Sequence, residues 1–362
     1  MKQNLKPKIC ILVDALSTGG AEKAASILSI LLSNDGYLVS IISLRDNITY
    51  SYKGTLFNLG ENEPSLKPLK QIQKTIKLRK AIRHINPHFI IDYRMRNRFL
   101  MEFILYQYIF RSYTNKIIYR INSFNIDWHI PKGSYFKNKY KKEKLVAVSL
   151  DIKKELENKY NFNNVTYIPN TFSVTNNNQQ SNNTIASENY ILAIGSLRNK
   201  TKQFDKLIAT YAQSILKNKG YKLYILGDGY DKTTLQTQIN NLKLQQDVVL
   251  LGYKKQIFNY IKQARYVVLC SKVEGFPNVL LEALSLNTPV VSFNCKSGPS
   301  EMVVDKQNGL LVKDQDFKAL KTAMETLILD EALYMHCKSN TNLTLHKFRA
   351  NTILNTWKQL FV

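Results

Sequence analysis

Two glutamates with seven residues between them stand in the part of the sequence that is most suited to chemistry. Glu274 lies in a loop after an apolar strand, and Glu282 falls about one and a half turns into the helix that Pro277 is expected to begin. A loop carboxylate can interact with a sugar ring or a developing oxocarbenium ion, and a helical carboxylate can accept hydrogen bonds from a ribose diol. The helix start, with Asn278 and Val279, offers amide groups to a phosphate. The alternative is a capping acid plus a surface glutamate.

A glycine turn with three cations follows a strand in the second half of the chain. Gly195 and Ser196 begin the turn, and Arg198, Lys200 and Lys202 follow. A diphosphate at the carboxyl end of a strand needs both hydrogen-bond donors and countercharge, and this loop supplies both. The alternative is a solvated basic loop, because basic residues are abundant in this chain.

Two further glycine turns follow expected strands. Gly19 and Gly20 open the first helix, where free N–H groups and the helix dipole favour an anion. The turn does not have the G-x-G-x-x-G pattern, so the nicotinamide fingerprint is absent. Gly227 begins the turn Gly227-Asp228-Gly229, and most turns of this kind are architectural.

Short apolar runs alternate with helical patterns along the chain, which is typical of parallel βαβ units. Strands are expected at 8–13, 38–44, 89–91, 117–120, 145–148, 190–194, 222–226, 248–251, 266–269 and 289–293. We therefore expect an α/β fold with two doubly wound, Rossmann-like domains that face a cleft between them. The domains are expected at 1–172 and 188–351, with a polar linker at 173–187.

Taken in order, the motifs resemble the retaining, nucleotide-sugar-dependent glycosyltransferases of family 4, which have the GT-B fold. The resemblance covers nearly the whole chain and is strongest from about 190 to 312. It rests on the E-x7-E spacing of Glu274 and Glu282 and on a series of shorter motifs: Gly19-Gly20-Ala21-Glu22, Ile168-Pro169-Asn170, Gly195 with Lys202, Gly227-Asp228-Gly229, Leu251-Gly252-Tyr253, Gly298-Pro299-Ser300-Glu301 and Asn308-Gly309-Leu310-Leu311-Val312.

The resemblance implies a role for each of these residues. Glu274 would lie against the donor sugar, Lys202 and Arg198 would act on the diphosphate, and catalysis would rest on these three side chains. The residues implied in nucleotide-sugar binding are Gly20, Gly195, Ser196, Lys202, Gly227, Asn278, Val279 and Glu282. The resemblance also implies that the final segment, 352–362, packs back on the N-terminal domain.

The chain departs from the family pattern at two places. The family's Gly-Arg-Leu reads Gly195-Ser196-Leu197, so Arg198 is the expected substitute for the missing arginine. A histidine that many members carry near the acceptor is absent from Tyr119-Arg120-Ile121-Asn122-Ser123. His129 is nearby, in what is expected to be an exposed loop. The acceptor candidates are therefore Arg120, Asn122 and His129, on weaker grounds than the donor residues.

The composition restricts the class of protein and the kind of partner. Among 362 residues, 44% are hydrophobic, which excludes a disordered or fibrous chain, and four cysteines without a C-x-x-C pair suggest neither a disulfide framework nor a zinc site. The formal net charge is +24, and residues 67–144 hold 19 Lys and Arg but only 4 Asp and Glu. Aromatic residues are interleaved there, which suits an anionic membrane surface, single-stranded nucleic acid or simply a solvated face. The most apolar stretch, 99–110, is too short to span a membrane.

We therefore expect a retaining glycosyltransferase that transfers a sugar from a nucleotide-diphosphate donor, with UDP-sugar as the default. The expected acceptor is a glycan or a polyprenyl-diphosphate-linked glycan in lipopolysaccharide, O-antigen or capsule assembly, at the inner face of the cell membrane. No metal and no further cofactor is expected. The alternatives are a nucleic-acid-binding protein, which would explain the charge but not the ordered turns, and another GT-B enzyme, either a sugar-nucleotide epimerase or a glycan phosphorylase.

Overall fold

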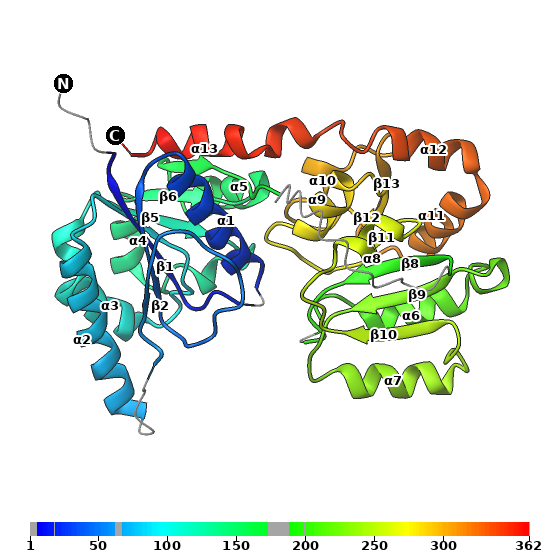
Figure 1. Cartoon of the computed structure of the whole chain (residues 1–362), viewed down its shortest axis with the longest axis horizontal. Coiled ribbons are helices and arrows are strands. Elements are labelled where there is room, and N and C mark those ends of the chain that lie inside the picture. Colours follow the sequence, from blue (N-terminus) through cyan, green and yellow to red (C-terminus); the bar gives the residue numbers. More distant parts are fainter. Residues whose placement is uncertain (1–5, 18, 62–66, 173–187, 199, 362) are drawn as a thin grey trace. The chain divides into compact units, whose positions relative to one another are not determined.

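The chain divides into two α/β units (Figure 1). The computed structural model describes residues 6–17, 19–61, 67–172, 188–198 and 200–361. Unit 1 comprises Met1–Thr171 together with Ala350–Val362, and unit 2 comprises Phe172–Arg349. The linker expected at 173–187 lies outside the described residues.

The described strands of unit 1 form one parallel sheet in the order β3-β2-β1-β4-β5-β6-β7. Their bounds are β1 (Lys8–Val13), β2 (Leu38–Ser43), β3 (Thr55–Asn58), β4 (Phe89–Asp92), β5 (Ile117–Ile121), β6 (Lys144–Ala147) and β7 (Val165–Tyr167). In the register, Ile9 of β1 lies opposite Val39 of β2 and Phe89 of β4. Every residue of β1 after Lys8 is buried, as expected for a central parallel strand with both faces covered.

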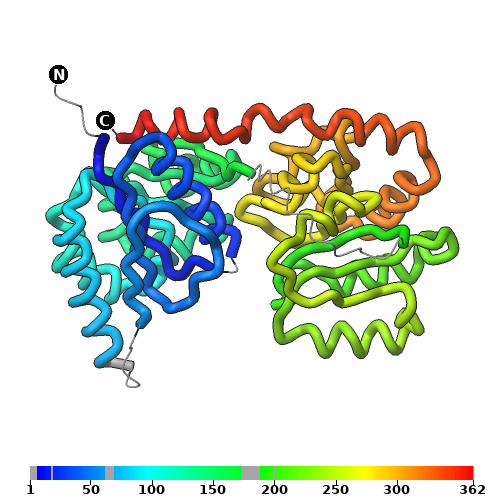
Figure 2. The backbone as a smooth tube through the Cα atoms, in the orientation of Figure 1, coloured from blue at the N-terminus to red at the C-terminus, as the bar shows by residue number. Residues whose placement is uncertain are grey.

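The helices of unit 1 include one from the end of the sequence. Their bounds are α1 (Gly20–Asn34), α2 (Lys67–Ile85), α3 (Phe99–Tyr108), α4 (Ser134–Tyr140), α5 (Leu150–Asn158) and α13 (Ala350–Lys358), with 3-10 turns at Phe110–Tyr113 and Ile126–Trp128. Figure 2 shows α13 beside α1, and the two helices are in contact. Trp357 of α13 is only 1% exposed and joins the same hydrophobic core as Leu28 and Leu32 of α1.

Unit 2 repeats the architecture with the strand order β10-β9-β8-β11-β12-β13. Its strands are β8 (Tyr190–Ile194), β9 (Lys222–Leu226), β10 (Val248–Gly252), β11 (Val267–Leu269), β12 (Val290–Phe293) and β13 (Gly309–Val312). Its helices are α6 (Phe204–Ala212), α7 (Lys232–Asn241), α8 (Phe258–Gln263), α9 (Asn278–Ser285), α10 (Pro299–Met302), α11 (Phe317–Leu329) and α12 (Glu331–Ser339), with 3-10 turns at Lys217–Lys219 and Leu345–Phe348. Both sheets are therefore doubly wound.

The α/β class and the two Rossmann-like sheets predicted from the sequence are confirmed, and each of the expected strands is present. Three further strands, β3, β7 and β13, were not predicted. Strands β3 (TLFN) and β7 (VTY) contain at most two consecutive apolar residues, and β13 (GLLV) begins at a glycine, so none of the three stands out in the sequence. One expected detail is wrong: Pro277 precedes α9 with ψ 78°, which is not helical, so the helix begins at Asn278.

Each sheet has a point at which the order of the strands reverses. In unit 1 the chain builds outward from β1 to β2 and β3 and then crosses to β4, and in unit 2 it does the same from β8 to β11. Ligands of such sheets bind beyond the carboxyl ends of the strands at this switch point. Within the described part of the chain, no helix combines the length and the apolar character needed to cross a membrane.

Candidate functional site

An ion pair joins the two loops that flank the switch point of unit 2. Lys202 follows β8 and Glu274 follows β11, and Lys202 Nζ lies 2.6 Å from Glu274 Oε1. The side chain of Lys202 is 23% exposed and that of Glu274 is 11% exposed, so both reach the surface of the site from a largely buried position. The structure therefore brings together two of the three residues expected to do the chemistry.

The backbone around the ion pair is fixed by contacts between the same two loops. The amide of Lys272 donates to the carbonyl of Thr201 at 2.9 Å, and Gln203 Nε2 donates to the carbonyl of Cys270 at 2.7 Å. Gln203 has φ 52°, in the left-handed region. This turn of the chain lets Gln203 point inward while the neighbouring Lys202 points toward Glu274.

Gly195 allows the stem of Lys202 to cross the end of β8. A Cβ atom added at Gly195 would lie 2.9 Å from Lys202 Cγ and 3.0 Å from Cε, so the lysine stem packs directly on the glycine backbone. A larger residue would push the ammonium group away from Glu274. A glycine is therefore needed at position 195 because the side chain of Lys202 passes so close to the backbone, whether or not a ligand also approaches it.

Gly227 supports the same loop from the neighbouring strand β9. Its φ is 144°, and an added Cβ would lie only 1.8 Å from the carbonyl oxygen of Gly195. The amide of Leu197 donates to the carbonyl of Asp228 at 3.1 Å, which ties the turn after β8 to the turn after β9. Ser196 and Arg198 are exposed beyond this junction. The role that the geometry shows for Gly227 is architectural.

The loop of Glu274 is also held from the opposite side, by the residues after β12. The amide of Glu274 donates to the carbonyl of Lys296 at 3.2 Å, and Ser297 Oγ donates to the carbonyl of Gly275 at 2.5 Å. Gly298 has φ 107°, and an added Cβ there would lie 2.4 Å from Pro277 Cδ. These contacts fix both the carboxylate and the start of α9.

Helix α9 carries the remaining predicted donor residues. Asn278 and Val279 form its first turn and are partly exposed, and Glu282 is the fifth residue and half-buried. Asn278 and Glu282 are four residues apart and so share one helix face, about 6 Å apart along the axis. The arrangement gives one polar face that begins beside the Glu274 loop.

Two buried side chains that the sequence did not single out also face this region. Gln203 is 1% exposed and Ser271 is fully buried, and Gln203 Oε1 and Ser271 Oγ have no hydrogen-bond partner among the described residues. The neighbouring thiol of Cys270 is also buried, and burial raises its pKa to about 12. This thiol therefore stays protonated at neutral pH and is not a nucleophile. No sequence pattern distinguishes a serine or glutamine of this kind from a surface residue.

The glycine turn of unit 1 also lies at its switch point. Gly20 begins α1, the first helix after β1, and Asp14 Oδ2 accepts a hydrogen bond of 2.9 Å from the amide of Met95, which follows β4. Glu22 folds back over Gly19, and its pKa is raised, chiefly because the carboxyl group is buried. Gly20 itself is exposed at this edge.

The three acceptor candidates lie together inside unit 1. Arg120 is 1% exposed and donates to Asn122 Oδ1 at 3.0 Å and to Asn170 Oδ1 at 2.7 Å. His129 is 3% exposed, and its Nε2 accepts from the amide of Asn122 at 3.3 Å. Burial, aided by the charge of Arg96, lowers the pKa of His129 to about 3. The expectation of an exposed loop histidine is therefore wrong, because Arg96, which donates to the carbonyl of His129, and the amide of Asn122, just after β5, hold the His129 loop against the core.

The basic segment 67–144 is also not a continuous surface. Arg94 and Arg96 are buried, and Arg94 forms ion pairs with Asp92 at 2.8 Å and Glu102 at 3.2 Å. Arg96 donates to four backbone carbonyls, of Asp92, Arg94, Arg120 and His129. These arginines, with Arg120, stabilise the interior of unit 1, so part of the positive charge cannot meet an anionic partner.

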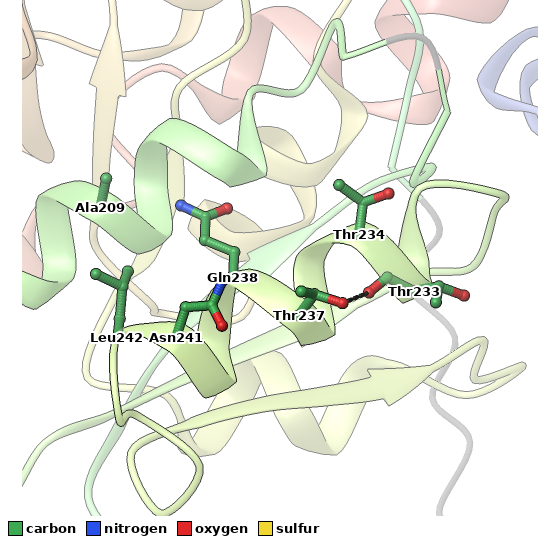
Figure 3. Close-up of a pocket in the computed structure, with 7 residues that line it drawn as sticks. All are labelled: Ala209, Thr233, Thr234, Thr237, Gln238, Asn241 and Leu242. Carbon is green, nitrogen blue, oxygen red and sulfur yellow. Dashed lines mark hydrogen bonds between the residues drawn. The ribbon is translucent and has the colours of Figure 1, made fainter.

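A groove of about 610 Å³ lies between α6 and α7 on unit 2 (Figure 3). Threonine, glutamine and asparagine side chains line most of it, with Ala209 and Leu242 at one end, and Thr237 Oγ1 donates to the carbonyl of Thr233 at 3.1 Å. None of the predicted site residues lines this groove. Among the described residues, no group of three or more His, Cys, Asp and Glu side chains is placed to hold a metal ion.

The two doubly wound units are those of the GT-B glycosyltransferases, and unit 2 places a cation and a carboxylate at its switch point. The family model described as glycosyl transferases group 1 matches residues 174–344. A glycosyltransferase of Methanocaldococcus jannaschii, itself uncharacterised, is 33% identical over 273 residues, which are 70% of this chain and 67% of that protein. The chain belongs to the group 1 glycosyltransferases.

A further relative agrees with this assignment, and a solved structure shows the same fold. A Campylobacter jejuni enzyme that adds N-acetylgalactosamine to a diphospho-undecaprenol-linked sugar is 28% identical over 350 residues, 90% of this chain and 91% of that enzyme. The structure of Staphylococcus aureus TarM, crystallised with UDP, has a TM-score of 0.77 with 14% identity and covers 98% of this chain and 99% of TarM. The GT-B fold predicted from the sequence is therefore confirmed, and the relatives include an enzyme of lipid-linked glycan synthesis.

Proposed function

We propose that the protein is a retaining glycosyltransferase that uses a nucleotide-diphosphate sugar, with a UDP-sugar as the donor, and transfers a hexosyl or N-acetylhexosaminyl group. The observation that carries the proposal is the ion pair between Lys202 and Glu274 at the switch point of unit 2. It sets a cation suited to a diphosphate beside a carboxylate suited to the sugar ring. The UDP in the crystals of TarM supports the choice of donor.

In the proposed reaction, the acceptor hydroxyl attacks the anomeric carbon from the face that the diphosphate leaves. The bond from the anomeric carbon to the phosphate oxygen breaks as the glycosidic bond forms, and that phosphate oxygen takes the proton of the hydroxyl. Lys202, Arg198 and the amides at the start of α9 would stabilise the charge that develops on the diphosphate. Glu274 would favour the positive charge that develops at the anomeric carbon.

The proposed acceptor is a glycan or a polyprenyl-diphosphate-linked glycan of the cell envelope, and the proposed place of action is the cytoplasmic face of the membrane. The Campylobacter relative supports this choice, since its printed name specifies an undecaprenol-linked substrate. The exposed basic residues of unit 1 support it as well, because they favour an anionic surface.

The proposal is tested by pairing a donor screen with one substitution. A thermal-shift series of UDP- and GDP-sugars should show stabilisation by a UDP-sugar, about 2.7 kcal/mol at a hundred times its dissociation constant. With that donor, Glu274→Gln should abolish transfer while nucleotide binding survives. Glu331→Gln is the matched control, because Glu331 also forms an ion pair, with Arg265, but lies on α12 with 64% of its side chain exposed.

Three outcomes would contradict the proposal. Unchanged turnover in Glu274→Gln would remove this carboxylate from the mechanism. Release of an epimerised sugar nucleotide, or cleavage of a glycan that requires phosphate, would identify a different GT-B enzyme. A strongly salt-dependent affinity for oligonucleotides without any donor binding would favour the nucleic-acid-binding alternative.

A further inference from the structure

Helix α2 of unit 1 has two apolar faces. One is buried in the unit and consists of Leu78, Ala81, Ile82 and Ile85. The other carries large apolar side chains that are at least half exposed: Leu69 (53%), Ile72 (58%) and Ile76 (50%). Figure 2 shows the first turns of α2, where this second set lies, extending beyond the strands of the unit.

The exposed residues form a regular stripe on the side of the helix away from the core. Their spacing of three and then four residues places them on one face. Ile72 and Ala81, like Ile76 and Ile85, are nine residues apart, which is about two and a half turns and therefore opposite sides of the helix. The stripe is therefore a second apolar face of α2 and not the edge of the face that packs against the core.

Basic side chains continue the outward face beyond the stripe. Arg79, Lys80 and Arg83 follow Ile76 by three, four and seven residues, so they lie on the same side, and all three are exposed. Over its whole length, α2 contains seven Lys and Arg residues and no Asp or Glu. The outward face is therefore apolar over its first turns and cationic over its last ones.

We propose that the outward face of α2 lies in the headgroup region of an anionic lipid bilayer, with the apolar stripe below the phosphates and the cations at their level. A helix with a charged face and an apolar stripe of this kind binds in the plane of the interface, and its cations bind anionic lipids. The charge argues against a second copy as the occupant, because two such faces in contact would bring like charges together.

The inference rests on the proposed membrane location and identifies the element that makes the contact. Within the segment 67–144 it selects α2, which is the element that combines an exposed apolar stripe with exposed cations, whereas Arg94, Arg96 and Arg120 are buried. Helix α2 lies outside the Lys202 and Glu274 site of unit 2, so binding to the bilayer and binding of the donor can be measured independently.

The test is flotation of the whole protein with phosphatidylcholine vesicles, with and without phosphatidylglycerol. The wild-type protein should float only with the anionic vesicles, and less at high salt. Ile72→Asp/Ile76→Asp should weaken binding about tenfold or more, because two buried aliphatic side chains are lost from the interface. Leu329→Asp/Met335→Asp is the matched control: it introduces the same two charges at residues of α11 and α12 that are 59% and 53% exposed, and it should float like the wild type.

A second variant avoids any change in the apolar stripe. Lys80→Glu/Arg83→Glu should reduce binding and flatten its dependence on salt. Equal flotation of wild type and both variants, or no flotation of the wild type at low salt, would overturn the proposal. So would sedimentation that shows a wild-type dimer and a monomeric Ile72→Asp/Ile76→Asp, since the stripe would then join two copies.

Nucleotide binding, measured on the same variants, separates this proposal from the proposed function. If α2 is only a membrane contact, each variant should bind UDP as the wild type does and transfer at the same rate to a water-soluble acceptor. Flotation that depends on α2 in a protein that binds no nucleotide sugar would support the bilayer contact and refute the enzymatic proposal.

Discussion

Replacing Glu274 by glutamine should tighten the binding of UDP, although it should also abolish transfer. In the structure the ammonium group of Lys202 is engaged by the carboxylate of Glu274 at 2.6 Å. A diphosphate must therefore compete with this carboxylate for the same cation. Glutamine keeps the shape of the side chain but removes the charge, so Lys202 becomes available to the diphosphate.

The size of the effect follows from the distance and the burial of the pair. Two unit charges about 4 Å apart interact by about 4 kcal/mol at the effective dielectric constant near a protein surface. The side chains are 23% and 11% exposed, so the loss of hydration when the pair forms offsets part of this attraction. Hydrogen bonds to charged groups contribute about 1.5–3 kcal/mol net, and the partial exposure of this pair sets its contribution at the lower end of that range. Since 1.36 kcal/mol is a factor of ten, the Kd for UDP should fall about tenfold.

Titration calorimetry of a double-mutant cycle tests this reasoning. Lys202→Met should weaken UDP binding, and Glu274→Gln should bring no gain in affinity when Lys202 is already methionine. An unchanged or weaker affinity of Glu274→Gln for UDP would refute the competition. The same gain in the presence and absence of Lys202 would show that Glu274 repels the diphosphate directly.

Two further predictions concern stability. Gly227→Ala should destabilise the fold by roughly 2–4 kcal/mol, because the added Cβ would lie 1.8 Å from the carbonyl oxygen of Gly195. Gly220→Ala is the control: its φ is 74° but the space around it is open, so it should lose only about 1–2 kcal/mol. Urea unfolding measures both losses, and equal losses would contradict the steric argument. In the folded protein the pKa of His129 is about 3, whereas in the unfolded chain it is near 6.5. The unfolded state therefore binds a proton that the folded state does not, and the free energy of unfolding should fall as the pH drops from about 6.5 to about 3, by up to about 1.4 kcal/mol per pH unit. His129→Gln should flatten this slope, and an unchanged pH profile would exclude His129 as its source.

The fold was predictable because its signals are local. Continuous apolar runs such as Lys8–Val13 and Tyr190–Ile194 become buried parallel strands, and the order of strands and helices leads to doubly wound sheets. Strand β3, at the edge of its sheet and partly exposed, has no such signal. Its pairing with β2 depends on a partner that is distant in the sequence.

For the candidate site, the sequence predicted which loops contribute to it but not the contacts between them. The sequence places Lys202 and Glu274 after strands that are expected in one sheet, but their contact depends on β8 and β11 being neighbours and on the left-handed turn at Gln203. Composition was a poor guide in unit 1, where Arg96 and Arg120 resemble surface cations in sequence but are buried among backbone carbonyls and aromatic rings. Burial of an arginine is decided by tertiary contacts that no local pattern records.

The core of unit 1 is built from two parts of the chain, one synthesised before unit 2 and the other after it. Ile353, Leu354 and Trp357 of α13 join the core that β1 and α1 begin, but 178 residues, from 172 to 349, are made in between. At 5–20 residues per second this interval is about 10–40 s. Throughout that time the nascent unit 1 exposes the apolar surface that α13 will cover, so unit 2 can complete its fold first although its residues come second.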